Sequence, residues 1–153
     1  AEYQVTIVTQ NIDNLHERAG CTNVTHLHGE LLKVRSSINN TLIYDWKGDL
    51  RLGDLAADSA QLRPHIVWFG EEVPLLDHAI EKTKNADLLV IIGTSMQVYP
   101  AASLINYVRI NTPIYVIDPN PSITKNAFNN LTIIKDVASL GTTRLLKHLK
   151  PTI

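Results

Sequence analysis

The residues that could do chemistry are a histidine and a set of amide and carboxylate side chains near the start of the chain. Gln10, Asn11 and Asp13 follow a β-branched, strand-like run, and His28 ends a second short apolar run. A histidine titrates near neutrality, so His28 could take a proton from a substrate hydroxyl. Positioned amides and carboxylates could orient a ligand and stabilise positive charge that develops on it. Because ligands of open α/β sheets bind beyond the carboxyl ends of strands, these residues indicate one site.

Each of these residues also has a purely structural interpretation. A strand-end histidine can serve only to bond the backbone, and Asn and Asp are common in turns and helix caps. Asp13 precedes a short helical pattern that ends at Gly20. It could therefore act as a helix cap and as a ligand at once.

A loop of mixed character follows at residues 67–71, with the sequence Val-Trp-Phe-Gly-Glu. Val67 and Phe69 could wall a narrow apolar tunnel, while Gly70 and Glu71 could offer backbone groups to an extended peptide. Core packing is the alternative, and we expect it for Trp68.

The tripeptide Gly93-Thr94-Ser95 follows the run 88–92, which has no polar face and predicts a fully buried strand. The glycine would permit close approach of a ligand, and the two hydroxyls could bond phosphate or ribose. The same tripeptide is also ordinary turn chemistry.

In this order, the segments resemble those of the sirtuins, the family of NAD-dependent protein lysine deacylases. The resemblance runs from about Val5 to the C-terminus. It is carried by residues 10–16 (QNIDNLH), 26–31 (HLHGEL), 68–71 (WFGE), 93–95 (GTS) and 98–102 (VYPAA).

The resemblance implies a role for each polar residue of the first cluster. His28 would be the general base that activates a ribose hydroxyl of NAD, whose 2′-oxygen takes the acyl group from the substrate lysine. Asn11 would lie near the reacting ribose carbon, so His28 and Asn11 are the expected catalytic residues. Gln10 would face the ribose and Asp13 would hold the nicotinamide carboxamide. His26 is expected to be structural.

The resemblance also implies two sets of binding residues. The first would contact acyl-lysine and peptide: Val67, Phe69, Gly70, Glu71 and Val98. The second would contact NAD, together with Gln10, Asn11 and Asp13: Gly93, Thr94, Ser95, Asp118 and Ala138. Sirtuins usually carry an asparagine at the position of Asp118, although an aspartate can also accept hydrogen bonds from ribose hydroxyls.

Hydrophobic periodicity predicts the elements that position these residues. The expected strands are 3–8, 24–27, 31–34, 88–92, 114–117 and 131–134. The expected helices are a short one from Asp13 to Gly20 and three longer ones at 74–85, 101–109 and 138–149, the last weakened by Gly141. Alternating strands and helices predict an α/β fold with a Rossmann-like parallel sheet, incomplete at its start.

A small inserted lobe is expected at residues 36–61, between the two parts of the main domain, 1–35 and 62–153. Many sirtuins hold this lobe with zinc on four cysteines. Here Ser36 and Ser37 stand where the first pair would begin, and Cys21 is the only cysteine. We predict no zinc, a hairpin at 41–46, and packing of Leu42, Tyr44, Trp46 and Leu55.

Composition narrows the classes of function. The chain has 153 residues and a net charge of −1 without a basic run, so nothing indicates nucleic acid. The longest apolar run is too short to cross a membrane, and no signal peptide is evident. One cysteine fits a reducing compartment, and the cytoplasm is the expected location.

The sequence lacks a Gly-rich strand–turn–helix before Tyr3, an element that in sirtuins cradles the pyrophosphate. We therefore expect the chain to be the C-terminal portion of a sirtuin. It would be nearly inactive alone, and surfaces left uncovered would favour a homodimer.

Three functions remain open. The leading one is NAD-dependent deacylation, and the alternative is a module that binds ADP-ribose, NAD or peptide without turnover. A Rossmann dehydrogenase is the third. Residues 15–18 and 63–65 look most like bacterial sirtuins that remove acidic acyl groups, which favours desuccinylation beside deacetylation.

Overall fold

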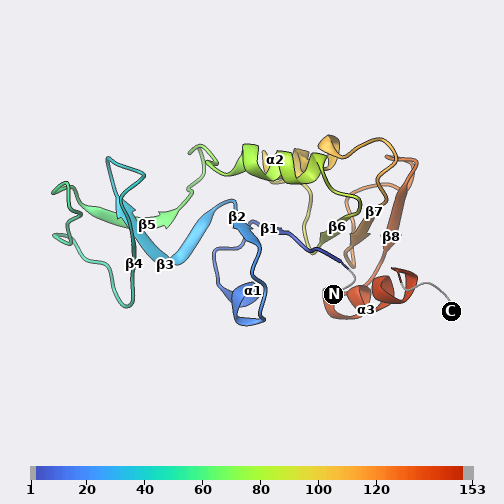
Figure 1. The fold of residues 1–153 in the computed structure, drawn as a ribbon, viewed down its shortest axis with the longest axis horizontal. Coiled ribbons are helices and arrows are strands. Elements are labelled where there is room, and N and C mark those ends of the chain that lie inside the picture. The colour runs from blue at the N-terminus through green and yellow to red at the C-terminus, as the bar shows by residue number, and fades with distance from the viewer. Residues whose placement is uncertain (1–2, 150–153) are drawn as a thin grey trace. The chain divides into compact units, whose positions relative to one another are not determined.

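The computed structural model describes residues 3–149, which form two compact units divided between Ala79 and Ile80 (Figure 1). Residues 1–2 and 150–153, which the predicted main domain includes, lie outside the described residues. The fold is mixed α/β with parallel sheets, as predicted. The predicted boundaries of the main domain and the inserted lobe stay a prediction.

The first unit begins with a parallel pair of short strands. β1 (Ile7–Thr9) pairs with β2 (Val24–His26), so that Thr9 lies opposite His26. The predicted first strand is thus shorter and starts at Ile7 rather than residue 3. The crossover contains α1 (Leu15–Arg18), whose first backbone N–H bonds the Asp13 carboxylate at 3.0 Å. The N-cap predicted at Asp13 is wrong by one residue: Asn14 precedes the helix and makes no side-chain cap bond, while Asp13 bonds Leu15 N–H from the position before it.

An antiparallel sheet with the order β4-β3-β5 completes the first unit (Figure 1). It consists of β3 (Gly29–Ser36), β4 (Ile43–Asp45) and β5 (Leu62–Ile66). The segment 41–46 supplies β4, whose partner is β3. The sequence analysis missed β5, because Arg63, Pro64 and His65 interrupt its apolar pattern. Pro64 is tolerated because β5 is an edge strand of this sheet.

A small core of Val34, Ala56 and Leu62 holds this sheet together, with Tyr44, Trp46 and Leu50 packed against it. The prediction for Leu55 is wrong: its side chain is exposed, and the neighbouring Ala56 takes the buried place.

Buried Ser36 connects the loops beside this core. Its hydroxyl donates to Asp58 at 2.7 Å and accepts from the N–H groups of Ile38 and Asn39. Within residues 3–149, no group of three or more His, Cys, Asp or Glu side chains could hold a metal ion.

The second unit is built on a parallel sheet with the order β6-β7-β8. Its strands are β6 (Leu89–Ile92), β7 (Ile114–Ile117) and β8 (Leu131–Ile134). α2 (Leu76–Lys84) leads into this unit and α3 (Ala138–Leu149) follows β8. Ile117, Ile134 and Leu145 form the core between α3 and the sheet.

Two expectations for the second unit are wrong. β6 is only half-buried and Ile92 is exposed, because β6 is an edge strand of the described sheet. The segment predicted as a helix at 101–109 is a 3₁₀ helix, η1 (Ala101–Tyr107). Gly141, the residue expected to weaken α3, is buried, and a Cβ atom there would overlap Cγ2 of Ile117. The glycine lets α3 approach β7 closely.

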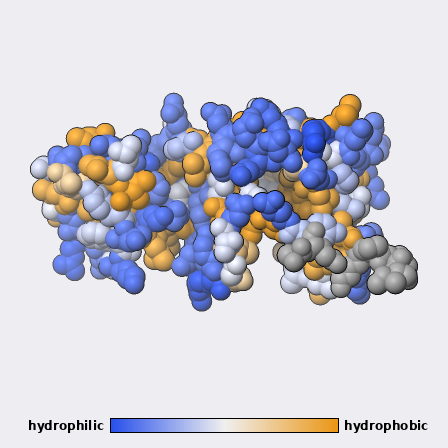
Figure 2. Space-filling model, viewed as in Figure 1, coloured by the Kyte–Doolittle hydropathy of each residue, from blue (hydrophilic) through white to orange (hydrophobic). Residues whose placement is uncertain are grey.

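Large apolar side chains remain exposed on both units, and apolar surface is visible between polar side chains in Figure 2. Among the most exposed are Leu52 and Phe69 in the first unit and Ile110 in the second. No helix within the described part of the chain is long and apolar enough to span a bilayer.

Candidate active site

The first unit brings His28 against the loop that leaves β1. Leu27 N–H donates to the carbonyl of Thr9 at 2.9 Å, which continues the parallel pairing beyond the strands. The His28 ring then lies with Nδ1 3.2 Å from the carbonyl oxygen of Gln10. The His28 carbonyl in turn accepts from Val67 N–H at 2.9 Å. His28 is therefore in direct contact with two other sequence-predicted site residues, Gln10 and Val67.

This contact fixes which nitrogen of His28 carries the proton. A carbonyl oxygen can only accept, so Nδ1 must be the donor. In the neutral ring, Nε2 then carries the free lone pair. Nε2 has no hydrogen-bond partner among residues 3–149, and the side chain is half-buried. His28 thus presents an unoccupied basic nitrogen.

Gln10 and Asn11 supply amide groups beside this base. The Gln10 Nε2 atom is buried and has no hydrogen-bond partner among the described residues, so it is a donor available to a ligand. The side chain of Asn11 is exposed, and its backbone N–H bonds the hydroxyl of Thr9 at 3.0 Å. Asp13, by contrast, uses one carboxylate oxygen to bond the backbone N–H of Leu15, the first residue of α1.

His26 differs sharply from His28 although it stands only two residues earlier. It is 7% exposed, with Nδ1 3.0 Å from the carbonyl oxygen of Asn11 and Nε2 2.8 Å from a carboxylate oxygen of Glu17. Burial acts to lower the pKa of His26, but the hydrogen bonds to Glu17 and Asn11 outweigh it and raise the pKa. The hydrogen bond from His26 lowers the pKa of Glu17.

The loop 67–71 is held by an ion pair rather than by core packing. Glu71 binds Arg63 with both oxygens, at 2.6 and 3.1 Å, and accepts from Trp68 N–H at 2.9 Å. The hydrogen bond from Arg63 lowers the pKa of Glu71. Trp68 is 53% exposed, so the core packing expected for it is wrong: the turn closed by Glu71 points its ring outward.

Phe69 at the tip of this loop is fully exposed, and Gly70 adopts a φ of +90°. The backbone N–H of Glu71 is already bonded to Trp68 within the turn, at 3.0 Å. Of the two residues expected to offer backbone to a peptide, Glu71 therefore has its N–H occupied.

Sequence reasoning missed two partners of these residues, Glu17 and Arg63. An arginine eight positions before a glutamate is a weak signal of a pair that closes a loop. No local pattern indicates that Glu17 would reach His26.

The second unit gathers its predicted residues at the carboxyl edge of its sheet. Gly93–Ser95 follow β6, Asp118 follows β7, and Ala138 begins α3 after β8. Gly93 N–H bonds the carbonyl of Ile117 at 3.0 Å, which ties the first two groups together. This is the edge at which parallel sheets bind ligands. Val98 lies in the loop before η1, partly exposed.

The polar side chains at this edge also stabilise local turns. The Thr94 hydroxyl accepts from Met96 N–H at 3.3 Å, and the Ser95 hydroxyl accepts from Gln97 N–H at 3.4 Å. Asp118 accepts from Asn120 N–H at 2.7 Å. The turn chemistry weighed as the alternative is thus present, and each oxygen retains a further lone pair for a ligand.

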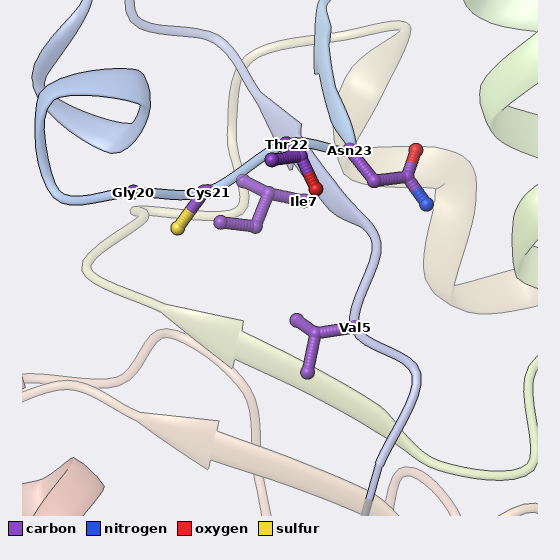
Figure 3. Close-up of a pocket in the computed structure, with 6 residues that line it drawn as sticks. All are labelled: Val5, Ile7, Gly20, Cys21, Thr22 and Asn23. Carbon is purple, nitrogen blue, oxygen red and sulfur yellow. The ribbon is translucent and has the colours of Figure 1, made fainter. Parts of the chain in front are cut away.

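The first unit contains pockets, two of which are defined by their lining residues. One, of about 170 Å³, is lined by residues of β1, the segment before it and the loop that precedes β2 (Figure 3). None of its lining residues is a predicted site residue: they are Val5, Ile7, Gly20, Cys21, Thr22 and Asn23. The other, of about 230 Å³, includes Asp13, Glu17 and His26 in its wall.

Comparison with known proteins places this arrangement in context. The model of the Sir2 family matches residues 1–100. An "NAD-dependent protein deacylase" of Helicobacter pylori is 61% identical over 125 residues, which cover 82% of this chain and 52% of that protein. One of the same description from Bacteroides thetaiotaomicron is 46% identical over 155 residues, 97% of this chain and 66% of that protein.

A solved structure indicates the same family. The crystal structure of a Sir2 homologue in complex with NAD is 35% identical, with a TM-score of 0.78 over 94% of this chain and 57% of that one. The chain therefore spans about half to two thirds of the length of the proteins that it matches.

Proposed function

The chain belongs to the Sir2 family, and from this premise we propose that it carries the catalytic base for NAD-dependent removal of acyl groups from protein lysine. The products would be nicotinamide and O-acyl-ADP-ribose. The observation that carries the proposal is the free Nε2 of His28, fixed by the Nδ1 contact to Gln10 and set beside an unpartnered amide donor.

The residues of the first unit fit this reaction in chemical terms. NAD, when bound, supplies the ribose carbon that receives the acyl oxygen and the nicotinamide that leaves. His28 would accept the proton of a ribose hydroxyl at Nε2 and hold it there. Gln10 would donate its free Nε2–H to the ribose, and Asn11 would lie near the reacting ribose carbon, where its amide could orient the ligand. Asp13 would use its remaining carboxylate oxygen on the carboxamide.

The second unit would hold the rest of NAD. Gly93, Thr94 and Ser95 would bind phosphate or ribose, Asp118 the adenine ribose, and Ala138 would lie near the adenine. These residues follow β6 and β7 or begin α3 after β8, so they share the carboxyl edge of the sheet, and this position supports the assignment.

The substrate would be an acyl-lysine in a protein or peptide. Val67 is bonded through its backbone to the carbonyl of His28, so its side chain and that of Phe69 are suited to the acyl-lysine stem. Gly70 and Val98 would pair with the peptide backbone, with Glu71 closing the loop through Arg63. Acetyl and succinyl groups are the proposed acyl groups. A homodimer and a cytoplasmic location stay predictions.

The test is turnover of acetyl- and succinyl-lysine peptides with NAD. It compares the 153-residue chain with a version extended upstream by the N-terminal segment of the Helicobacter pylori relative. Each is made as the parent, as His28→Ala, and as His78→Ala, which changes an exposed histidine of α2. We expect the extended protein to release nicotinamide, and loss of His28 to slow it about 10²–10⁴-fold. An extended protein that binds ADP-ribose but never turns over would instead be a binding module.

A further inference from the structure

We propose that His26 is a positioning residue for the reaction of His28, acting as an imidazolium that ties the Asn11 carbonyl to the Glu17 carboxylate. The inference rests on the proposed function and adds a residue that acts on the loop 9–12 through its backbone. It contrasts with the merely structural role expected for His26 from the sequence.

The loop 9–12 is held at four consecutive carbonyl groups, all by donors from the segment 26–31. Thr9 O accepts from Leu27 N–H at 2.9 Å, and Ile12 O accepts from Leu31 N–H at 2.8 Å. Between them, two side chains take the place of backbone donors. The ring of His28 donates to Gln10 O at 3.2 Å, and the ring of His26 donates to Asn11 O at 3.0 Å.

The two rings are therefore interleaved along one stretch of backbone. Removing the His26 donor would leave the Asn11 carbonyl unbonded, next to the only other ring that holds the loop. Gln10 O and Asn11 O belong to neighbouring peptide groups joined at Cα of Asn11, so a displacement of the peptide group that carries Asn11 O is passed on to the one that carries Gln10 O. The orientation of His28 depends on that oxygen, so His26 acts on His28 through the backbone.

The charge on His26 follows from what surrounds it. Both ring nitrogens face acceptors, and a neutral imidazole can donate to only one of them. The ring is buried, so water cannot replace the lost donor. Only the imidazolium satisfies both contacts.

The neighbouring charges favour that form. The pocket beside His26 contains four carboxylates, Asp13, Glu17, Glu30 and Asp45, against one ammonium, Lys33, which is paired with Glu30 at 2.9 Å. His16 also lies near Glu17. As the pH rises through the raised pKa of His26, one of the two hydrogen bonds is lost and the loop loosens.

The first experiment reads the rings directly in the 153-residue chain. Histidine labelled with ¹⁵N is titrated between pH 5 and 9 by NMR, in the parent, in Glu17→Gln, and in Glu81→Gln as a control on an exposed helix face. We expect His26 to remain doubly protonated to a higher pH than the exposed His78. Glu17→Gln should lower the His26 pKa, because it removes the carboxylate that bonds Nε2, and Glu81→Gln should leave it unchanged.

The same samples report on the loop. Amide hydrogen exchange of Leu27 and Leu31, whose N–H groups bond the ends of the loop, should accelerate about tenfold in Glu17→Gln. If His26 titrates like His78, or if Glu17→Gln leaves its pKa and both amides unchanged, the proposal is overturned. Neither reading requires an active enzyme, so failure of the proposed function would appear separately, as an extended protein without turnover.

The second experiment measures the consequence for turnover in the extended protein. His26→Gln keeps one donor but no charge, and we expect kcat to fall about tenfold with KM for the acyl peptide unchanged. In the parent, kcat should also decline as the pH rises through the His26 pKa that NMR gives, and this decline should be absent in His26→Gln. An unchanged kcat, or a change in KM alone, would refute positioning.

Discussion

Replacing Gly29 with alanine tests how the site is assembled, because Gly29 directly follows His28 and is the first residue of β3. Gly29 has a φ of +82°, and a Cβ atom there would overlap the carbonyl oxygen of His65 and lie 2.9 Å from Cα of Ile66. These are backbone atoms of β5, so no side-chain rotation relieves the overlap. We expect the Gly29–Ile66 pairing to separate, and with it the hydrogen bond of Val67 N–H to His28 O.

The loss of stability can be built from two contributions. An L-residue in the left-handed region costs about 1–2 kcal/mol. Separation of the strands leaves backbone groups without partners, at about 1–3 kcal/mol. Gly29→Ala should therefore destabilise the first unit by about 2–5 kcal/mol. Gly48→Ala is the matched control, since Gly48 has a φ of +102° but no atom within 4 Å of a Cβ. It should cost only the first contribution, about 1–2 kcal/mol.

The assay is urea unfolding followed by tryptophan fluorescence. The chain has two tryptophans, Trp46 and Trp68, and both lie in the first unit, so the signal reports the part that Gly29 affects. Equal losses in Gly29→Ala and Gly48→Ala would refute the reasoning, because the overlap with His65 would then carry no energy. In the extended protein, Gly29→Ala should also abolish turnover, since it displaces the loop 67–71 from His28.

Three further substitutions test the packing around the two units. Gly141→Ala should destabilise the second unit by about 1–3 kcal/mol, because the cost of the overlap with Ile117 exceeds the helix-propensity gain of about 1 kcal/mol. Urea unfolding followed by far-UV circular dichroism measures this loss of stability. Ser36→Ala should cost about 1–3 kcal/mol in fluorescence-monitored unfolding, because it removes the three hydrogen bonds that the buried hydroxyl makes to Asp58, Ile38 and Asn39. Glu71→Gln should make stability depend less on pH in acid. The hydrogen bond from Arg63 lowers the Glu71 pKa, so the ion pair's contribution to stability is complete above about pH 4.5 and disappears as the pH falls through the lowered pKa. The urea midpoint of unfolding, measured against pH, will show the difference.

Two of these substitutions have a control at a neighbouring exposed residue, and each of the three has a result that would contradict it. Ser37→Ala and Glu72→Gln alter exposed neighbours of the residues tested and should leave stability and its pH dependence unchanged. A stabilised Gly141→Ala would mean that propensity outweighs the contact with Ile117. A Ser36→Ala variant as stable as Ser37→Ala would remove Ser36 from its connecting role. An unchanged acid profile in Glu71→Gln would show that the ion pair with Arg63 contributes nothing to folding.

The sequence predicted best those elements whose apolar pattern is unbroken. The strands at 114–117 and 131–134 and the helix at 138–149 have the predicted bounds. Each has residues whose intrinsic preference agrees with its packing, so local and tertiary signals coincide. The fold class followed from the alternation of such elements.

The misses on strands share one cause, which is that pairing between distant segments decided the outcome. β5 contains a proline and two charged or titratable side chains, and it is a strand only because β3 lies beside it. The burial of 88–92 was overestimated because periodicity describes a strand's faces but not the number of its neighbours. The misses on Leu55 and Trp68 are local: Leu55 lies in an isolated bridge with Gln61 and Trp68 begins the turn closed by Glu71, and both side chains are exposed.

For the candidate site, residue types were predictable and protonation states were not. His26 and His28 are the same residue type, two positions apart, and both bond the loop after β1 through Nδ1. What separates them is the other nitrogen. In His26 it meets the carboxylate of Glu17, brought there by α1, and the pKa of the ring is raised although burial acts to lower it. In His28 it meets no hydrogen-bond partner among residues 3–149. One short helix, placed by the crossover between β1 and β2, thus gives His26 a charged partner that His28 lacks.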